Sequence, residues 1–416
     1  MKESAKTLPL IIIIAIVAVC SYWLGSQNRT IEKELPAKDK VINYINKNRE
    51  AGNDINLTEK FGNNFSKMNF EGVNLNGVIL KDADLSYSNL RNATFDNADL
   101  SGSNFKYTNM SRSSLSGATL TNTDFSYTDL SKANLEAVKL ENSNFSYANL
   151  KNSNLKGAII QNIDFSYANL QNSVLLSADL KGSKFEGADL SHADIRKAKL
   201  ENANMLGADL EFANLKNAQL QNANLEGAFM YKARINEVNA TGAIFSQANM
   251  QRSDLQNSNL TGATLEQTNL TDANLWDANF ENAKLSKSIF TSAQLWDANM
   301  AGANLDGATF YRANLDGAKL NKANVQDASF KNATLNGANL KGANLQDADL
   351  KGVSLKNVNL IGANLQDANL KSTEILKSDF SGANIIGAIF TNANIKNSKF
   401  EGVILDGAID LDIAQE

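Results

Sequence analysis

Residues 145–170 read FSYANLKNSNLKGAIIQNIDFSYANL, and the letters SYANL at Ser146–Leu150 return unchanged at Ser166–Leu170. A return after twenty residues matches neither the helical period of about 3.6 residues nor the strand period of about two. A longer structural unit must therefore set the repeat, and that unit decides the fold.

A five-residue frame runs through most of the chain without an insertion or deletion. Counting in fives from Phe65 to Leu405 gives 69 positions, and 68 of them hold Leu, Phe, Met, Ile or Val. Only Ala240 breaks this rule, and its small side chain predicts a gap in the core there. Two residues before each large residue, from Val73 to Ala408, the chain carries Ala, Ser, Thr or Val, with Ile163 as the exception. Large and small core positions thus alternate in a fixed order.

Glycine marks the corners of this frame. All twenty-two glycines after Phe65 stand two residues after a large apolar residue, as in Gly77, Gly157 and Gly342, and Asn is common at the same place. Both residues tolerate the positive φ that a type II turn requires at its third position. If each unit turns the chain by about a quarter circle, four units complete one coil, which explains the twenty-residue return.

The expected fold is an all-β solenoid whose coils stack at the spacing of adjacent strands. Sixty-nine units make about seventeen coils, so the rod is expected to be about 80 Å long. A single unit buries almost nothing by itself, so stability must come from stacking, and the ends need caps.

The segments ADLSYSNL, ANLQDADL and GANLQDANL resemble the A-[DN]-L-x-x motif of the pentapeptide-repeat family. The resemblance covers roughly 350 of the 416 residues. It implies a right-handed quadrilateral β-helix. The segment VINYINKNREAGNDINL is similar to the short cap that precedes the repeats in some members. Family members share no common activity, and some imitate DNA and bind type II topoisomerases, so the resemblance addresses fold and not function.

Composition limits the possible chemistry. The formal net charge of −5 does not suggest a basic nucleic-acid binder, and we expect no direct binding to nucleic acid. One cysteine, Cys20, and one histidine, His192, cannot form a disulfide framework or a Cys/His metal cluster within one chain. We therefore expect no cofactor, no metal and no catalytic residue. The oligomeric state cannot be read from the sequence.

The run Leu8–Gly25, LPLIIIIAIVAVCSYWLG, is apolar over about the length that crosses a bilayer. We interpret residues 1–25 as an uncleaved transmembrane anchor. A cleaved signal peptide and a lipoprotein signal through Cys20 are the alternatives. Residues 26–38 are expected to form a linker, 39–60 an N-terminal cap with a short helix around Val41–Arg49, 61–410 the repeat β-helix, and 411–416 a tail.

The most plausible catalytic group is a column of carboxylates at Asp327, Asp347 and Asp367, which lie twenty residues apart and so stack. Their separation resembles that of the carboxylate pair in retaining glycosidases. Lysines at 331, 351 and 371 follow four residues later, which favours a charged surface ladder over a hydrolase. His192 stands at a turn position and is interpreted as a solvated corner residue.

Two aromatic columns point outward and are the candidate partner-binding residues. Their positions at turns are unusual, because tyrosine disfavours positive φ, so we expect the tyrosine edge to use a different turn from the others. Each column is either a stacking ladder that stiffens an edge or a docking strip for a partner. The residues are Tyr87, Tyr107, Tyr127, Tyr147 and Tyr167 in one column, and Trp276 and Trp296 in the other.

The sequence favours a non-catalytic, membrane-tethered structural rod that presents these ladders to an unknown protein or envelope partner. The alternative is a DNA-mimicking topoisomerase-binding protein. Beyond Lys60 the chain has 31 Lys and Arg against 38 Asp and Glu, a net charge of −7. That charge is sparse beside DNA, which carries about one negative charge per 1.7 Å. A carboxylate-based glycan hydrolase is a remote third possibility.

The short basic start, with Lys2 and Lys6, is typical of an export signal and predicts a single-pass protein of the bacterial inner membrane. The solenoid would then lie outside the cytoplasm. Four basic residues just beyond the apolar run oppose this orientation under the positive-inside rule. They are Arg29, Lys33, Lys38 and Lys40.

Overall fold

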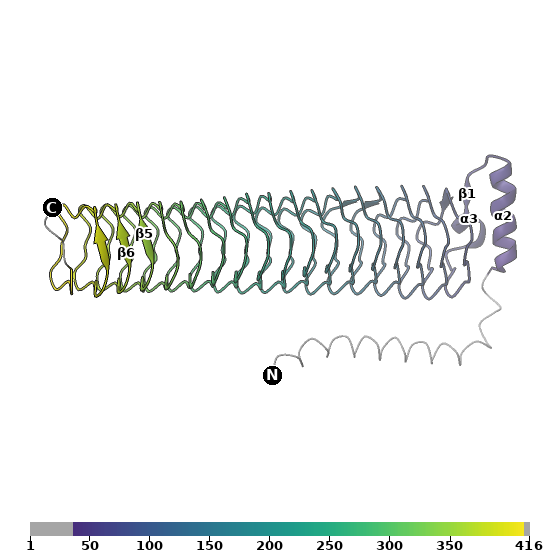
Figure 1. Cartoon of the computed structure of the whole chain (residues 1–416). Coiled ribbons are helices and arrows are strands. Elements are labelled where there is room, and N and C mark those ends of the chain that lie inside the picture. The colour runs from purple at the N-terminus through teal and green to yellow at the C-terminus, as the bar shows by residue number, and fades with distance from the viewer. Residues whose placement is uncertain (1–35, 412–416) are drawn as a thin grey trace, which may run out of the picture.

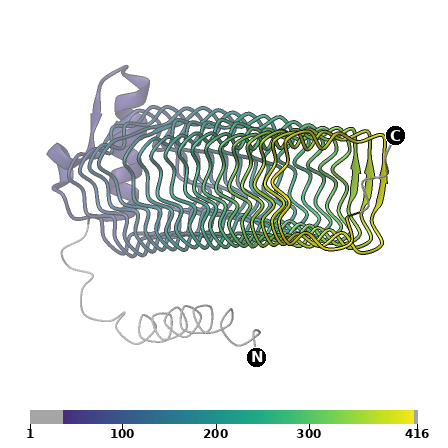
Figure 2. The same cartoon turned by 90° about the vertical axis from the view of Figure 1, so that its left-hand side faces the viewer.

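The computed structural model describes residues 36–411, which form one straight rod of stacked coils with helix α2 at its N-terminal end (Figures 1 and 2). The apolar run Leu8–Gly25 lies outside the described residues. Within residues 36–411, no helix has the length and apolar character needed to cross a membrane.

The coils repeat every twenty residues, as the sequence predicts. Parallel bridges join Asp84 to Asn104, and the same offset of twenty residues holds from Asn64↔Asp84 to Ile389↔Ile409. Each coil contributes four such bridges, one for each five-residue unit, so four parallel ladders run along the rod. The constant offset means that no coil between these bridges contains an insertion or a deletion.

Longer stretches of pairing appear at only a few places, because each side of a coil provides about three extended residues before the next corner. The paired strands, all parallel, are β1 (Ile55–Asn56) with β2 (Val78–Ile79), β3 (Lys139–Leu140) with β4 (Ile159–Ile160), and β5 (Ser354–Lys356) with β6 (Glu374–Leu376) and β7 (Asn394–Lys396).

Two helices close the N-terminal end. Helix α2 (Lys38–Glu50) contains the segment for which the spacing predicts a helix, and it buries Val41 and Ile45 against the first coils. The guanidinium of Arg49 donates to the carbonyl oxygen of Asn76 at 3.0 Å, which ties α2 to the solenoid. The short helix α3 (Leu57–Phe61) is N-capped by Asn56, whose Oδ1 accepts from the N–H of Glu59 at 2.9 Å.

In the unit 165–169 every backbone N–H has an acceptor, and the five acceptors are of three kinds; where Val174, Phe229 or Ile244 stands at the place equivalent to Asp164, the side-chain acceptor is absent. Three N–H groups donate to carbonyls of neighbouring coils, one closes the turn within its own unit, and one donates to the Asp or Asn side chain two residues earlier. In the unit 165–169 the donor and acceptor pairs are Phe165 to Lys184 (2.7 Å), Ser166 to Asp164 Oδ1 (2.9 Å), Tyr167 to Glu186 (2.8 Å), Ala168 to Phe165 (3.0 Å) and Asn169 to Ala148 (2.9 Å).

The core is a continuous column of the large and small inward residues. It is fully enclosed from Phe65 to Phe390, whereas Phe400 is only partly buried and Leu405 is 48% exposed. Many Ser and Thr hydroxyls at small positions reach a carbonyl of the preceding coil, as Ser183 Oγ does to Ile160 at 2.7 Å. The buried hydroxyls of Ser113, Ser153 and Ser173 have no hydrogen-bond partner among the described residues.

The exception at Ala240 has a neighbour that the frame alone does not reveal. Val238 occupies the small position on the same side of the coil and is 3% exposed, while Ala240 is fully buried. The usual order of small then large is therefore reversed at this place. Because total core volume matters more than the order of its parts, Val238 offsets some of the volume that Ala240 removes.

Replacement of Asp164 by Leu is expected to expose the Ser166 amide to faster exchange, since the side-chain acceptor disappears at a cost of about 1 kcal/mol. Asp164→Asn is the matched control, because Asn144 accepts from the Ser146 N–H at 3.0 Å in the preceding coil. Hydrogen exchange of the peptide around 166 measures the difference. Equal exchange in the two variants would contradict the role assigned to Asp164.

Candidate partner-binding surface

The predicted tyrosine column is present as a continuous stack on one edge of the rod. Neighbouring ring centroids lie 4.9–5.1 Å apart and the rings are within 23° of parallel. Each of the five side chains is 37–47% exposed. Because the rings stack face to face along the rod, their edges and hydroxyls point outward and form a narrow phenolic strip.

The expectation of a different turn at this edge was wrong. Tyr87, Tyr107, Tyr127, Tyr147 and Tyr167 all adopt φ of 59–60°, the same left-handed conformation as the Asn and Gly residues at other corners. A non-glycine residue in this region costs roughly 1–2 kcal/mol. Stacking between aromatic rings contributes about 0.5–1.5 kcal/mol per pair, which offsets most of that cost.

A second aromatic stack lies directly inside the first. Phe105, Phe125, Phe145, Phe165 and Phe185 are fully buried at the large core position, with centroids 4.7–5.1 Å apart. Tyrosines 107, 127, 147 and 167 each follow a phenylalanine of this stack by two residues, whereas Tyr87 follows Leu85, so the buried stack fixes most of the corner that carries the exposed one. The tyrosine edge is therefore rigidly positioned.

The strip has a defined end. The ring of Tyr167 lies over Gly187 in the next coil, where a Cβ would stand only 2.8 Å from two ring carbons. The Tyr167 hydroxyl donates to Glu186 Oε1 at 3.4 Å, and the charge of Glu186 raises the pKa of Tyr167. Toward the N-terminal end of the strip, Lys106 Nζ lies 5.6 Å from the ring centroids of both Tyr107 and Tyr127.

The tryptophan column does not join the tyrosines. Trp276 and Trp296 stack at 5.4 Å and are 40% and 48% exposed. Their place in the five-residue frame is two corners away from the tyrosine column, and a four-cornered coil puts them on the opposite edge. The two candidate groups are therefore separate surfaces.

A third aromatic cluster was missed by the sequence analysis. His192 is exposed at a corner, as predicted, and its ring also stacks on that of Phe212 with centroids 4.9 Å apart. Lys232 Nζ lies 5.7 Å from the Phe212 ring and 5.3 Å from the Tyr231 ring, and Arg252 donates to the Tyr231 hydroxyl at 3.3 Å. Writing the chain in rows of twenty would have placed these residues together.

The carboxylates of Asp327, Asp347 and Asp367 are exposed at corners with φ of 53–57°. Within residues 36–411, the carboxylate of Asp327 accepts only from the side chain of Gln326, at 3.4 Å, and that of Asp367 only from the side chain of Gln366, at 3.2 Å. Within residues 36–411 no group of three or more His, Cys, Asp or Glu could hold a metal ion. This arrangement is that of a surface ladder.

Comparison with known proteins agrees with this geometry. The family model described as a pentapeptide repeat region matches residues 88–165, 128–205, 283–360 and 303–380, which is more than half of the chain. The chain belongs to the pentapeptide-repeat family. A second model, pentapeptide repeats of eight copies, matches further segments between 64 and 409. No curated protein gives a significant match to this pentapeptide-repeat protein.

Among solved structures, the chain is 29% identical to HetL of the cyanobacterium Nostoc sp. strain PCC 7120, a pentapeptide repeat protein involved in regulation of heterocyst differentiation. The match covers 59% of this chain and 92% of HetL, with a TM-score of 0.31. It is 18% identical to QnrB1, a plasmid-mediated fluoroquinolone resistance protein, over 52% of this chain and 83% of QnrB1, with a TM-score of 0.22.

Gly187→Ala is expected to destabilise the protein more than Gly207→Ala, which changes the same column one coil later. Both glycines have positive φ, 60° and 62°, but a Cβ at Gly207 meets nothing within 4 Å. The added crowding against the Tyr167 ring should cost roughly 1–3 kcal/mol beyond the shared backbone term. Chemical denaturation of the two variants measures the difference, and equal losses would show that Tyr167 is not held by this contact.

Proposed function

We propose that this protein is a non-catalytic rod, a right-handed four-sided β-helix of about seventeen coils, that binds a protein partner along its tyrosine edge. The observation that supports the proposal is the exposed stack from Tyr87 to Tyr167. Its rings present apolar edges and phenolic hydroxyls on a wall whose other outward positions are mostly polar. Tyrosine is enriched at protein interfaces because it combines both properties with little side-chain freedom.

Rigidity supports the same proposal. The tyrosine rings are already stacked, and the buried phenylalanine stack fixes their corner, so little side-chain entropy remains to be lost on binding. A partner that contacts the strip meets a surface already in its bound arrangement.

The charge distribution argues against imitation of DNA. A DNA mimic needs a uniformly negative surface, whereas exposed lysines and arginines such as Arg112, Lys132 and Lys351 interrupt the wall of this rod. The net charge of −7 beyond Lys60 is also small for a rod of about 80 Å.

Photocrosslinking in the cells that make this protein tests the proposal. A photoreactive amino acid at Tyr127 is expected to give a discrete protein adduct, whereas the same residue at the exposed Asn257, on the opposite edge, is expected to give none. Mass spectrometry identifies the adduct. If neither position, nor Tyr87 or Tyr167, gives an adduct to any protein, the proposed function is wrong.

We also propose that the apolar run Leu8–Gly25 tethers the rod to a bacterial inner membrane with the solenoid outside the cytoplasm. The length of the run and the basic residues before it support this orientation. Alkaline phosphatase fused after Glu416 should be active, and a cytoplasmic fluorescent reporter at the same point should be dark. The reverse pair of results would contradict export.

A further inference from the structure

One side of the rod is bordered by two edges of opposite charge. The tyrosine edge consists of two turn residues in each coil, namely the residue in the Tyr87 column and the residue immediately before it in the sequence. The lysine edge consists of the two turn residues five positions later. Between them lies a single outward column, which includes Asn89, Asn149 and Asn369. We call the surface formed by both edges and this column the bipolar face.

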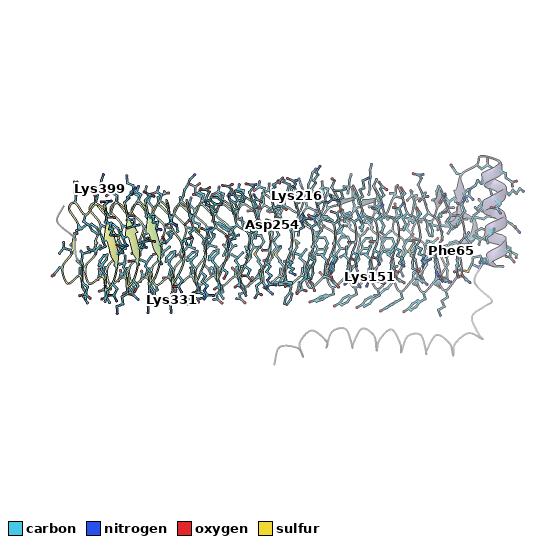
Figure 3. The ribbon with its side chains drawn as sticks, in the orientation of Figure 1. Phe65, Lys151, Lys216, Asp254, Lys331 and Lys399 are labelled. Atoms are coloured by element: carbon cyan, nitrogen blue, oxygen red, sulfur yellow. The ribbon has the colours of Figure 1, made fainter. Side chains whose placement is uncertain are left out.

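The two edges carry unlike net charge over their whole length. The tyrosine edge has three basic residues (Lys67, Lys106, Lys287) against eight acidic ones (Glu186, Glu226, Glu266, Asp306, Asp327, Asp347, Asp367, Asp406). The lysine edge has ten basic residues (Arg91, Arg112, Lys132, Lys151, Lys232, Arg252, Arg312, Lys331, Lys351, Lys371) against three acidic ones (Glu71, Glu211, Asp272). Figure 3 labels Lys151 and Lys331, which belong to this second edge.

Six coils carry unlike charges on the two edges, and two carry like charges, Lys106 with Arg112 and Glu266 with Asp272. In the first coil the signs are reversed on both edges together, with Lys67 on one and Glu71 on the other. Where the tyrosine edge carries aspartate at 327, 347 and 367, the lysine edge carries lysine at 331, 351 and 371. Where it carries tyrosine at 107 and 127, the lysine edge carries Arg112 and Lys132, and cations bind the rings of tyrosine.

In the middle coils the two edges also differ in side-chain size, with small residues on one edge and large residues on the other. The tyrosine edge has glycine at 187, 207 and 227, where the lysine edge has His192, Phe212 and Lys232. Phe212 is 41% exposed, and its stacked neighbours hold it in place. A bulky edge that lies against a glycine edge can pack closely, so shape and charge both make the bipolar face complementary to itself.

The charged groups of the last matched coils form no ion pair within the part of the chain that the structure describes. Among the described residues, no ion pair involves Lys331, Lys351 or Lys371, or the aspartates across the face from them. The two edges belong to opposite borders of the face, and a side of a coil is about 10 Å wide, which is too far for a direct contact. A second molecule can supply the missing partners.

Symmetry fixes how a second copy would lie. A twofold axis parallel to the rod places the tyrosine edge of one copy on the lysine edge of the other, at the same coil, with both rods pointing the same way. An axis across the face would make the rods antiparallel and bring edges of like charge together. We propose that two copies of this chain pair side by side through their bipolar faces, parallel and in register.

The available area is sufficient for a stable pair. A face about 80 Å long and about 10 Å wide buries on the order of 800 Å² on each copy, close to a standard protein interface. The coil spacing of the two copies is identical, so a match at one coil is repeated at the next. Two rods anchored by their N-termini in one membrane would point the same way, as this arrangement requires.

This inference rests on the proposed function, because it names a second copy as a partner for the tyrosine edge. The full chain, purified in mild detergent, is expected to have the protein mass of a dimer by light scattering. Replacing the three lysines K331D/K351D/K371D turns three charge pairs, each present twice by symmetry, into repulsions. The dimer dissociation constant should rise at least about tenfold at low salt.

A reciprocal variant separates this effect from misfolding. When D327K/D347K/D367K is added to the triple lysine variant, the two edges exchange their charges. This sixfold variant is expected to dimerise again. Direction is tested in a Cys20→Ser background, where a D347C chain mixed with a K351C chain should form an intermolecular disulfide. The D347C chain alone should form none.

A monomeric wild-type chain, or an equally stable dimer of the triple variant, would overturn the parallel pair. A disulfide from D347C alone would overturn its direction. The proposed function fails separately: a monomer whose position 127 still crosslinks to an unrelated protein keeps a partner on the tyrosine edge, whereas absence of any adduct removes both.

Discussion

The fold depends on the hydrogen bonds that the backbone N–H groups of each five-residue unit donate to neighbouring coils. A chain that changes direction every five residues cannot satisfy all of them by strand pairing alone. Neighbouring coils accept three, the turn accepts one, and the side chain of Asp or Asn accepts the fifth, as Asp164 does for Ser166. The Asp or Asn of the A-[DN]-L-x-x motif supplies this last acceptor, and units with Val174, Phe229 or Ile244 at that position lack it while they keep the bonds between coils.

Stacking at a fixed offset turns sequence columns into surface features. Equivalent residues of successive coils lie about 4.8 Å apart, the distance at which aromatic rings stack and carboxamides form hydrogen bonds. The tyrosine column uses this spacing on one edge. An amide ladder uses it elsewhere, where Asn344, Asn364 and Asn384 each donate to the asparagine of the coil before at 2.9 Å. Function in such a protein is carried by columns and not by a cleft.

Much of the fold could be predicted from the sequence because it is written in a local pattern. The five-residue frame, the alternating core positions and the corner at Gly157 all follow from spacing and from the conformational freedom of glycine. The conformation at Tyr147 could not be predicted in this way. The local backbone preference of tyrosine disfavours positive φ. The stabilisation that offsets it comes from stacking on tyrosine rings twenty residues away in the sequence.

The same reasoning explains what was missed on the surface. The compensation of Ala240 by Val238 and the stack of His192 on Phe212 depend on neighbours in space and not on the frame. The tyrosine column was found because five identical letters recur. Of the lysine edge only Lys331, Lys351 and Lys371 were found, because residues such as Arg91 and Lys132 share their charge without sharing a letter or a position within the unit.

The unbroken offset of twenty residues has a consequence for how such a chain can change length. Insertion of a whole coil between the tyrosines and the aspartates moves the aspartates outward along the same edge. Insertion of a single five-residue unit would preserve the alternation of large and small core positions and every turn, yet it would shift all later columns by one corner. The edges on either side of the insertion would no longer be continuous. The length of the rod can therefore change without disrupting the surface columns only in steps of four units. Other changes in length would keep the fold but interrupt these columns.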